Sequence, residues 1–391
     1  MKRRQLQTNW SEKRLGEVAN FVNGRGFKPH EWKTSGLPII RIQNLNGSDE
    51  FNYYQGEFDS KLLVKPGTLL FAWSGSKGSS FGPHFWTKQI DGLLNYHTWK
   101  IEPSAQIEKY FLYQALKELT VEIEEEAHGA AGLVHIQKGW IESWSIQLPP
   151  LPEQQKIADI LGTWDEALEK LDALIAAKAR RKQALMQQLL TGHRRLPGFS
   201  KPWAQTTFGQ FLTESRIEGS DGLTAQKITV KLYGRGVLAK QERMVGSSNT
   251  KYFVRRAGQI IYSKLDFLNG AFGIIPRELD GFESTLDLPS FEVKPSADAR
   301  WLLAYLVRPE FYEKQVGAAA GGRIARRVNP PEFLKIRLKA PEIAEQRAIA
   351  AVLDTADAEL RLLRQQRTAL DHQKRGLLQQ LLTGRIRVAA P

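Results

Sequence analysis

Apolar residues recur every three or four positions through two long stretches of the chain, residues 153–192 and 345–384. This spacing is a heptad seam, the pattern of helices that pack against a partner along one stripe. We expect both stretches to be long helices that pair with each other as an antiparallel coiled coil. The seam residues are Ile157, Leu161, Trp164, Leu168, Leu171, Leu185 and Leu189 in the first stretch and Ile349, Leu353, Leu360, Leu363, Leu377 and Leu381 in the second.

The two stretches are copies of one another. They align without a gap, are identical at 18 of 40 positions, and both end in Gln-Gln-Leu-Leu-Thr-Gly. Fainter matches link the segments that precede them, such as Trp10 with Trp203 and Pro103 with Pro295. The chain is therefore a tandem repeat of one unit, a variable globular domain followed by a nearly constant helix.

The segments outside these helices have a mixed pattern. Short β-type runs, such as residues 37–42 and 260–262, precede helical stretches near residues 107–126 and 299–316. We therefore predict an α+β fold, with two α+β domains separated by two long repeated helices and an internal pseudo-twofold axis. The predicted division is 1–147 for the first domain, 148–195 for the first helix, 196–337 for the second domain and 338–391 for the second helix.

Composition and charge narrow the class of partner. The 391 residues suit two or three domains, and the net charge of +13, most of it in residues 196–337, favours a polyanionic partner. The chain has no cysteine, which excludes disulfides, zinc–cysteine sites and a thiol nucleophile. No apolar run approaches the roughly 18 residues of a membrane span or follows the basic N-terminus as in a signal peptide, so we expect a cytoplasmic protein.

Two local patterns would, if functional, make the chain an enzyme. Residues 329–332, Asn-Pro-Pro-Glu, are similar to the catalytic loop of amino-methyltransferases, but a glutamate replaces the aromatic ring of that loop, and no glycine-rich cofactor loop precedes it. Asp287, Glu292 and Lys294 imitate the acid–acid–lysine set of metal-dependent nucleases, at a shorter spacing than usual. We therefore expect no catalytic, cofactor-binding or metal-binding residues. A stand-alone nuclease and a scaffold without DNA specificity are the alternatives.

Several motifs together resemble the specificity subunits of type I restriction-modification systems, over essentially the full length of the chain. They are LPPLPEQQKIADIL at the start of the first helix, QQLLTG at the end of both, Asn23-Gly24-Arg25-Gly26-Phe27, GLPIIRIQNL at residues 36–45 and PGTLLFAWSGS at residues 66–76. The second domain has Ser263-Lys264-Leu265-Asp266 where the first has Trp73-Ser74-Gly75-Ser76. We therefore expect the two domains to read different sequences.

The resemblance implies a non-catalytic DNA-binding subunit with two target-recognition domains, each of which reads one part of an asymmetric two-part target. The two helices would set the unread gap: a helix of about 38 residues spans roughly 57 Å, and half-sites one turn apart lie about 34–36 Å from each other. The implied partners are double-stranded DNA, two modification subunits and the restriction subunits. The modification subunits would use S-adenosylmethionine to methylate adenine, and the restriction subunits would use ATP and Mg²⁺, so this chain would hold no cofactor.

Reading of base edges requires arginine, lysine, asparagine and glutamine side chains, on loops where glycine allows close approach. The candidates in the first domain are Arg25, Lys28, Arg41, Gln43, Asn44, Ser74, Ser76 and Lys77, and those in the second are Arg235, Lys251, Lys264, Asn269, Arg323, Arg326 and Arg327. The alternative for each is a solvated surface position. We expect the tryptophans Trp10, Trp99, Trp140, Trp203 and Trp301 to be core anchors rather than platforms for bases.

Overall fold

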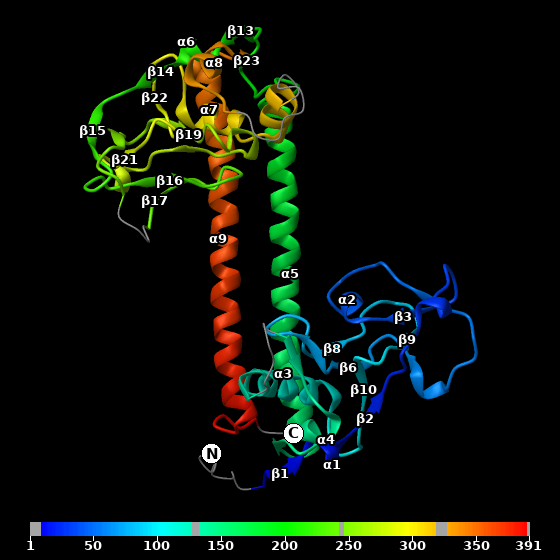
Figure 1. Cartoon of the computed structure of the whole chain (residues 1–391). Coiled ribbons are helices and arrows are strands. Elements are labelled where there is room, and N and C mark those ends of the chain that lie inside the picture. Colours follow the sequence, from blue (N-terminus) through cyan, green and yellow to red (C-terminus); the bar gives the residue numbers. More distant parts are fainter. Residues whose placement is uncertain (1–8, 127–132, 242–245, 318–326, 389–391) are drawn as a thin grey trace. The chain divides into compact units, whose positions relative to one another are not determined.

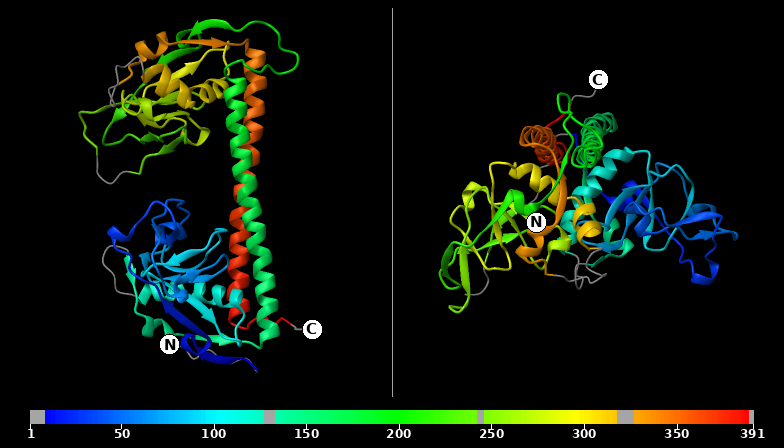
Figure 2. Two further views of the ribbon diagram at one scale, coloured as in Figure 1. Left: turned by 90° about the vertical axis from the view of Figure 1, so that its right-hand side faces the viewer. Right: turned by 90° about the horizontal axis from the view of Figure 1, so that it is seen from above.

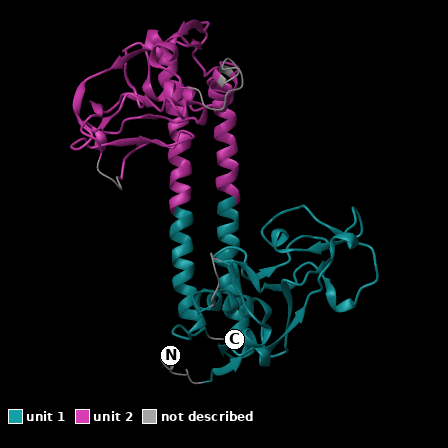
Figure 3. Ribbon diagram, in the orientation of Figure 1, with its two compact units in different colours: residues 1–172, 366–391 teal, residues 173–365 magenta. Residues whose placement is uncertain are grey.

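The computed structural model describes residues 9–126, 133–241, 246–317 and 327–388, and the chain divides into two compact units (Figure 3). Unit 1 consists of Met1–Asp172 and Gln366–Pro391, and unit 2 of Ala173–Gln365. Both units mix helices and strands, as the α+β prediction requires. The division runs through the two long helices, so each unit holds one globular part and a segment of each helix.

The two long helices are α5 (Leu151–Leu189) and α9 (Ile343–Leu382), as the repeated heptads predict (Figure 1). Prolines precede both helices, and Gly192 and Gly384 follow them with positive φ angles of 73° and 68°, a conformation that commonly terminates helices. All thirteen predicted seam residues are buried or partly buried in their own unit.

Ion pairs between the helices fix their direction in each unit. The pairs are Asp165–Lys374 and Asp172–Arg367 in unit 1, and Lys178–Glu359 and Lys182–Asp357 in unit 2. In both units the residue numbers rise on one helix as they fall on the other, so the two segments are antiparallel. They lie side by side in each view of Figure 2. Two of the pairs, Asp165–Lys374 and Lys182–Asp357, occupy matching positions of the repeat.

Each globular part is built on the same four-stranded antiparallel sheet, called here the inner sheet. Its strand order is β2-β10-β6-β8 in unit 1 and β14-β22-β19-β20 in unit 2. The bounds in unit 1 are β2 Ala19–Asn23, β10 Thr98–Pro103, β6 Leu69–Ala72 and β8 Gly82–Phe85. Those in unit 2 are β14 Leu212–Ser215, β22 Ser290–Val293, β19 Ile260–Tyr262 and β20 Phe272–Ile274.

A two-stranded antiparallel ladder closes each unit next to the long helices. It pairs β1 (Ser11–Arg14) with β12 (Ser145–Leu148) in unit 1 and β13 (Ala204–Thr207) with β23 (Arg337–Ala340) in unit 2. The two ladders, α5 and α9 are called the frame below. Unit 1 has a further short ladder between β7 (Ser74–Ser76) and β11 (Leu133–His135).

The remaining strands form an outer lobe in each unit, and here the two units differ. In unit 1 the strand order is β4-β3-β9-β5, with β3 and β9 parallel, whereas unit 2 has a three-stranded sheet β15-β18-β21 and a hairpin β16–β17. The bounds are β3 Leu37–Ile40, β4 Tyr53–Tyr54, β5 Leu63–Val64, β9 Gly92–Leu94, β15 Glu218–Asp221, β16 Ile228–Val230, β17 Val237–Ala239, β18 Lys251–Val254 and β21 Glu283–Ser284. Each outer lobe has a small hydrophobic core that it shares with one inner-sheet strand, through Leu70 of β6 in unit 1 and Ile261 of β19 in unit 2.

The shorter helices agree in part with the sequence pattern. The predicted helix near 107–126 is α3 (Lys109–Glu126), but the one near 299–316 is divided into α7 (Ala299–Leu306) and a π-helical turn at Glu310–Gly317. Pro309 lies between the two and lacks the N–H that a continuous helix would need. The other helices are α1 Leu15–Val18, α2 Ile42–Leu45, α4 Lys138–Glu142, α6 Phe208–Phe211 and α8 Pro330–Lys335, with 3₁₀ turns at Pro29–Glu31, Ser60–Leu62, Phe267–Asn269 and Arg277–Leu279.

The main core of each unit contains residues from its globular part and from both helices. In unit 1, Ile157 of α5 and Leu381 of α9 are buried with Phe111 of α3. In unit 2, Leu189 and Ile349 are buried with residues that include Phe208 and Trp301. The globular parts therefore share their cores with the helices.

Trp10, Trp99 and Trp301 are buried, as expected of core anchors, and Trp140 and Trp203 are partly buried. Among the described residues, no helix has both the length and the apolar composition needed to cross a membrane.

A glutamate–glutamine pair at the start of each long helix joins it to the globular part. In unit 1, Glu153 is 4% exposed and accepts hydrogen bonds from Trp10 Nε1 (3.0 Å) and from Nε and Nη2 of Arg387 (both 2.8 Å). The next residue, Gln154, accepts from the backbone N–H of Glu108 at 2.8 Å and donates to the carbonyl of Pro149, also at 2.8 Å. Three distant segments thereby meet at the first turn of α5.

Unit 2 repeats this arrangement. Glu345 is 1% exposed and accepts hydrogen bonds from Arg195 Nε (2.6 Å), Arg195 Nη2 (2.7 Å) and Trp203 Nε1 (3.1 Å). Gln346 accepts from the backbone N–H of Asp298 at 3.0 Å. Since a buried carboxylate is stable only when its oxygens are paired, the Trp–Glu–Arg cluster specifies how the ladder and the helices meet.

We expect Glu153→Gln to lower the free energy of unfolding by about 2 kcal/mol at neutral pH, because it leaves the Arg387 guanidinium without its charged acceptor. The hydrogen bond from Arg387 is the main reason why the pKa of Glu153 lies below its ordinary value of 4.5. The stabilisation is therefore present above about pH 4.5 and is lost as the pH falls below it. Urea unfolding at pH 7 and pH 4 measures both effects. Glu169→Gln, at an exposed position of the same helix, is the control. Equal losses in the two variants would contradict a role for the cluster.

Candidate DNA interface

The loop after β3 carries three of the predicted DNA-contacting residues of unit 1, and the structure gives them different environments. Arg41 Nη1 donates to Asn52 Oδ1 at 2.9 Å, and the guanidinium lies 5.3 Å from the centre of the Trp32 ring. Gln43 is exposed. Asn44 is only 3% exposed; it accepts from the backbone N–H of Arg41 at 3.0 Å and donates to the carbonyl of Glu50 at 2.8 Å. Asn44 thus shapes the loop, and a base contact by this residue would require these bonds to break.

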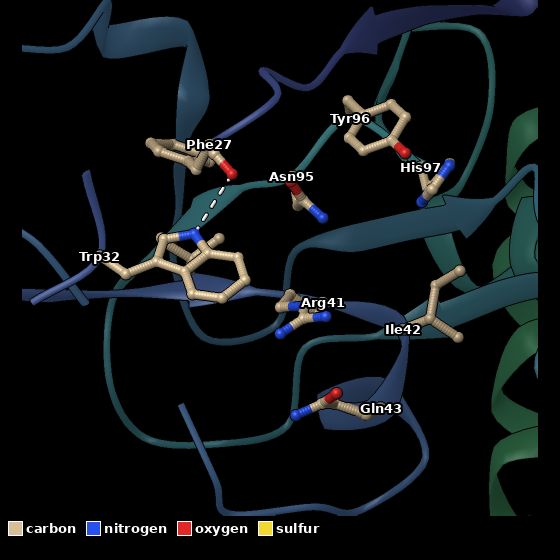
Figure 4. A pocket seen from close by; sticks show the side chains of 9 residues that line it. Phe27, Trp32, Arg41, Ile42, Gln43, Asn95, Tyr96 and His97 are labelled. Atoms are coloured by element: carbon tan, nitrogen blue, oxygen red, sulfur yellow. Dashed lines mark hydrogen bonds between the residues drawn. The ribbon is translucent and has the colours of Figure 1, made fainter. Parts of the chain in front are cut away.

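A pocket of about 380 Å³ lies beside this loop (Figure 4). Its polar groups come from Arg41, Gln43 and Asn95 and from the polar atoms of Tyr96 and His97, and the rest of the lining is aromatic and aliphatic. The complete lining is Phe27, Trp32, Ile39, Arg41, Ile42, Gln43, Asn95, Tyr96 and His97. Asparagine and glutamine can pair with the edge of adenine, while an apolar wall suits the methyl group of thymine. The pocket therefore carries side chains of the types that contact base edges, with Arg41 suited to guanine and the two amides suited to adenine.

Arg25 and Lys28 lie in the same outer lobe. Arg25 donates to the hydroxyl of Tyr54 at 3.0 Å and forms an ion pair with Glu31, and its guanidinium lies 4.9 Å from the centre of the Phe27 ring. These contacts satisfy much of Arg25 inside the protein and support the wall of the pocket. Lys28 is exposed, which suits a phosphate contact.

Ser74, Ser76 and Lys77 come from β7 and the turn after it, outside the pocket lining. The ring of the neighbouring Trp73 links this group to the pocket, because it packs 6.4 Å from the Tyr96 ring and 5.4 Å from the His97 ring. Burial lowers the pKa of His97, and the nearby His135 lowers it further, so the imidazole is neutral at pH 7 and can accept a hydrogen bond. Lys77 Nζ donates to the carbonyl of Glu124 at 3.3 Å.

The candidates of unit 2 fall into two groups and one separate position. The first group is Arg235 and Asn269: Arg235 is exposed in the turn between β16 and β17, and the backbone N–H of Tyr233 in this turn donates to the carbonyl of Asn269 at 2.9 Å. Lys264 and Arg327 meet at Asp287, whose carbonyl accepts from the Lys264 backbone N–H at 2.9 Å and whose carboxylate pairs with Arg327 at 3.2 Å. The separate residue is Lys251, exposed at the start of β18. Arg323 and Arg326 lie outside the described residues.

The residues that imitate enzyme motifs have other partners. Asp287 pairs with Arg327, Glu292 accepts a hydrogen bond from Gln259, and Lys294 Nζ donates to the carbonyl of Gly209 at 2.8 Å. Within the described part of the chain, no group of three or more histidine or acidic side chains is placed to hold a metal ion. The Asn-Pro-Pro-Glu segment begins helix α8, with Asn329 as its N-cap residue and Pro330 buried.

Sequence reasoning did not identify Trp32, Asn95, Tyr96 and His97 as parts of the site. The signal was weak: residues 95–97 are a polar and aromatic run directly after a short apolar strand. They come close to Arg41 only because β9 pairs in parallel with β3, with Leu94 beside Ile40. A parallel pairing between strands so far apart in sequence is not visible in the hydrophobic pattern.

The chain is similar to the specificity subunits of type I restriction-modification systems. Residues 7–178 match the model of the type I restriction modification DNA specificity domain. The chain is 23% identical to the MjaVIII specificity subunit of Methanocaldococcus jannaschii, over 97% of this chain and 93% of that protein. It is 28% identical to the EcoBI specificity subunit of Escherichia coli, over 48% of this chain and 40% of that protein. The S subunit of a type I restriction-modification system from M. genitalium shares the fold, with a TM-score of 0.59, 15% identity and 98% of each chain covered.

We expect Asn95→Ala to relax base preference at one position of the bound DNA, with a loss of about 1–3 kcal/mol of discrimination, because the variant lacks a paired donor and acceptor. Sequencing of duplexes selected from a randomised pool would measure this. The control is Gln89→Ala, which removes an exposed amide of the same unit outside the pocket. Base preferences that are the same in both variants would contradict a reading role for the pocket.

Proposed function

This chain belongs to the specificity subunits of type I restriction-modification enzymes, and we propose that it reads a two-part DNA target, with one part bound by the globular region of each unit. A role in DNA sequence specificity follows from the family. The finer proposal depends on one observation: the inner sheet and the frame are the same in both units, while the outer lobes differ. A scaffold that is repeated with two different outer lobes suits a target with two different halves.

The candidate residues support this division. Arg25, Lys28, Arg41 and Gln43 lie in the outer lobe of unit 1, and Arg235 and Lys251 lie in that of unit 2. These are the residue types that bind base edges and phosphates. We therefore propose that the outer lobes determine which bases are read, and that Arg323, Arg326 and Arg327 add backbone contacts in unit 2.

We further propose that the long helices set the unread gap between the half-sites. Helix α5 has 39 residues and α9 has 40, each equivalent to about 60 Å of continuous helix. Coiled-coil packing supports this role, because the ion pairs and the buried seam residues hold the two helices against each other within each unit.

The chemistry is proposed to reside in partner subunits. Two modification subunits would methylate adenine with S-adenosylmethionine, and restriction subunits would cleave unmodified DNA with ATP and Mg²⁺, in the cytoplasm. The net charge of +13 supports a DNA-binding role for this chain within such a complex. The involvement of Asp287, Glu292 and Lys294 in other contacts supports a non-catalytic role for this chain.

Single-molecule sequencing of DNA from the source cells, with and without this gene, tests the proposal. We expect a two-part motif with adenine methylation that disappears when the gene is deleted. No change in methylation would contradict the proposal. Nicking of DNA by the purified chain with Mg²⁺ alone, abolished by Asp287→Ala, would instead establish the nuclease alternative.

The spacer proposal predicts the effect of lengthening both helices. Insertion of four residues near Ala176 and four near Leu363 adds about one turn, or about 6 Å, to each helix. We expect the unread gap to grow by about one or two base pairs at about 3.4 Å each, with both half-sites unchanged. The methylation motif of cells that carry the variant measures this. Altered half-site bases with an unchanged gap would contradict the spacer role.

A further inference from the structure

A second cavity, also of about 380 Å³, lies in unit 2, and none of the candidate DNA-contacting residues lines it. Its lining comes from the residues that follow α5, from the β13–β23 ladder with the adjacent Trp203, and from Tyr305 of α7 and the nearby Arg308. Three of its lining residues are cations, Arg308, Arg337 and Lys339, and none is acidic. Trp203 and Tyr305 provide aromatic walls. The cavity therefore combines a concentrated positive charge with apolar surface.

Arg308 is the buried cation of this cavity. It is 8% exposed, its Nε donates to the carbonyl of Tyr305 at 3.2 Å, and its guanidinium lies 4.0 Å from the centre of the Tyr305 ring. Burial lowers the pKa of Arg308, and the contacts with Tyr305 and the charge of the exposed Glu310 offset only part of this effect. Within the described residues, no carboxylate forms an ion pair with Arg308. A buried guanidinium without a carboxylate partner is costly, and an anion entering the cavity would offset that cost.

The repeat provides an internal comparison, because unit 1 has the same ladder with different residues. The registers of β1–β12 and β13–β23 place Ser145 and Gln147 of unit 1 at the positions of Arg337 and Lys339 in unit 2. Glu12 takes the position of Gln205. Arg14 takes the position of Thr207, so over these four positions unit 1 has one negative and one positive side chain, whereas unit 2 has two positive ones. The repeated frame itself does not require these cations.

We propose that this cavity binds a carboxylate on an acidic segment of a protein partner that docks on the frame. Arginine presents a planar fork that matches carboxylate geometry, and the rings of Trp203 and Tyr305 suit the hydrocarbon stem of an acidic side chain. Arg308 is only 8% exposed and lines the cavity, whereas the phosphates of a duplex lie on a convex surface and meet exposed cations more readily. The location on the frame, rather than on an outer lobe, also favours a protein.

The inference rests on the proposed function, because that function supplies the partner: a modification subunit that is used twice. Two identical partners would meet the same frame but different charge in the two units. Docking at unit 2 is therefore tighter and more sensitive to salt than docking at unit 1.

The test uses the complete chain and the modification subunit encoded with it. Arg337→Ser with Lys339→Gln gives unit 2 the residues of unit 1, and both side chains are exposed, so the fold should be retained. We expect one of the two partner-binding steps to weaken about tenfold at about 0.1 M salt and far less at about 0.5 M, where charges are screened over a few ångströms. Native mass spectrometry of titrations measures both steps. The converse variant, Ser145→Arg with Gln147→Lys, leaves the unit 2 step unchanged.

Unchanged partner affinity in the double variant at both salt concentrations would overturn the inference. Weaker DNA binding with unchanged partner binding would also overturn it, and would assign the cavity to a DNA phosphate. If the unaltered chain binds no modification subunit, the proposed function fails, and this inference fails with it. Arg308→Gln provides a second variant, expected to weaken the same step, with urea unfolding to verify its fold.

Discussion

A buried carboxylate at the start of each long helix joins parts of the chain that are far apart in sequence. Glu153 binds Trp10, 143 residues before it, and Arg387, 234 residues after it. A carboxylate in such a position is tolerated only when hydrogen-bond donors surround it, so the ladder, the helix and the end of the chain must all be in place together. The remaining structure of unit 1 is oriented by this junction, and Glu345 has the same role in unit 2.

The duplication separates what must be constant from what can vary. The glutamate–glutamine pairs, the inner sheets and the frame recur in both units, and each main core includes residues of both helices. The outer lobes pack in separate small cores, which meet the inner sheets at Leu70 of β6 and Ile261 of β19, so their strands contribute little to the main cores. This division explains how one scaffold can accommodate two different sets of polar side chains.

The sequence predicted the long helices and the α+β class because heptads and a gapless internal repeat are strong periodic signals. It missed the interruption of the 299–316 helix at Pro309 and the sharing of each core between a globular part and both helices. It also missed Asn95, Tyr96 and His97, since their proximity to Arg41 depends on a parallel strand pairing that leaves no local pattern. Asn44 shows the converse problem: its residue type suits base reading, but its burial and hydrogen bonds assign it to the loop.

Unit 1 is discontinuous in sequence, because residues 366–391 belong to it and all of unit 2 is inserted before them. During synthesis on the ribosome, the chain emerges from its N-terminus onwards. Unit 2 can therefore acquire its full set of contacts while unit 1 still lacks Leu381 and Arg387. Until those residues emerge, the Glu153 carboxylate lacks its Arg387 partner, and the apolar face of α5 in unit 1 lacks the part of its cover that α9 provides. The first part of the protein to be made is thus the last to be completed, and until then it exposes apolar surface that the finished protein covers.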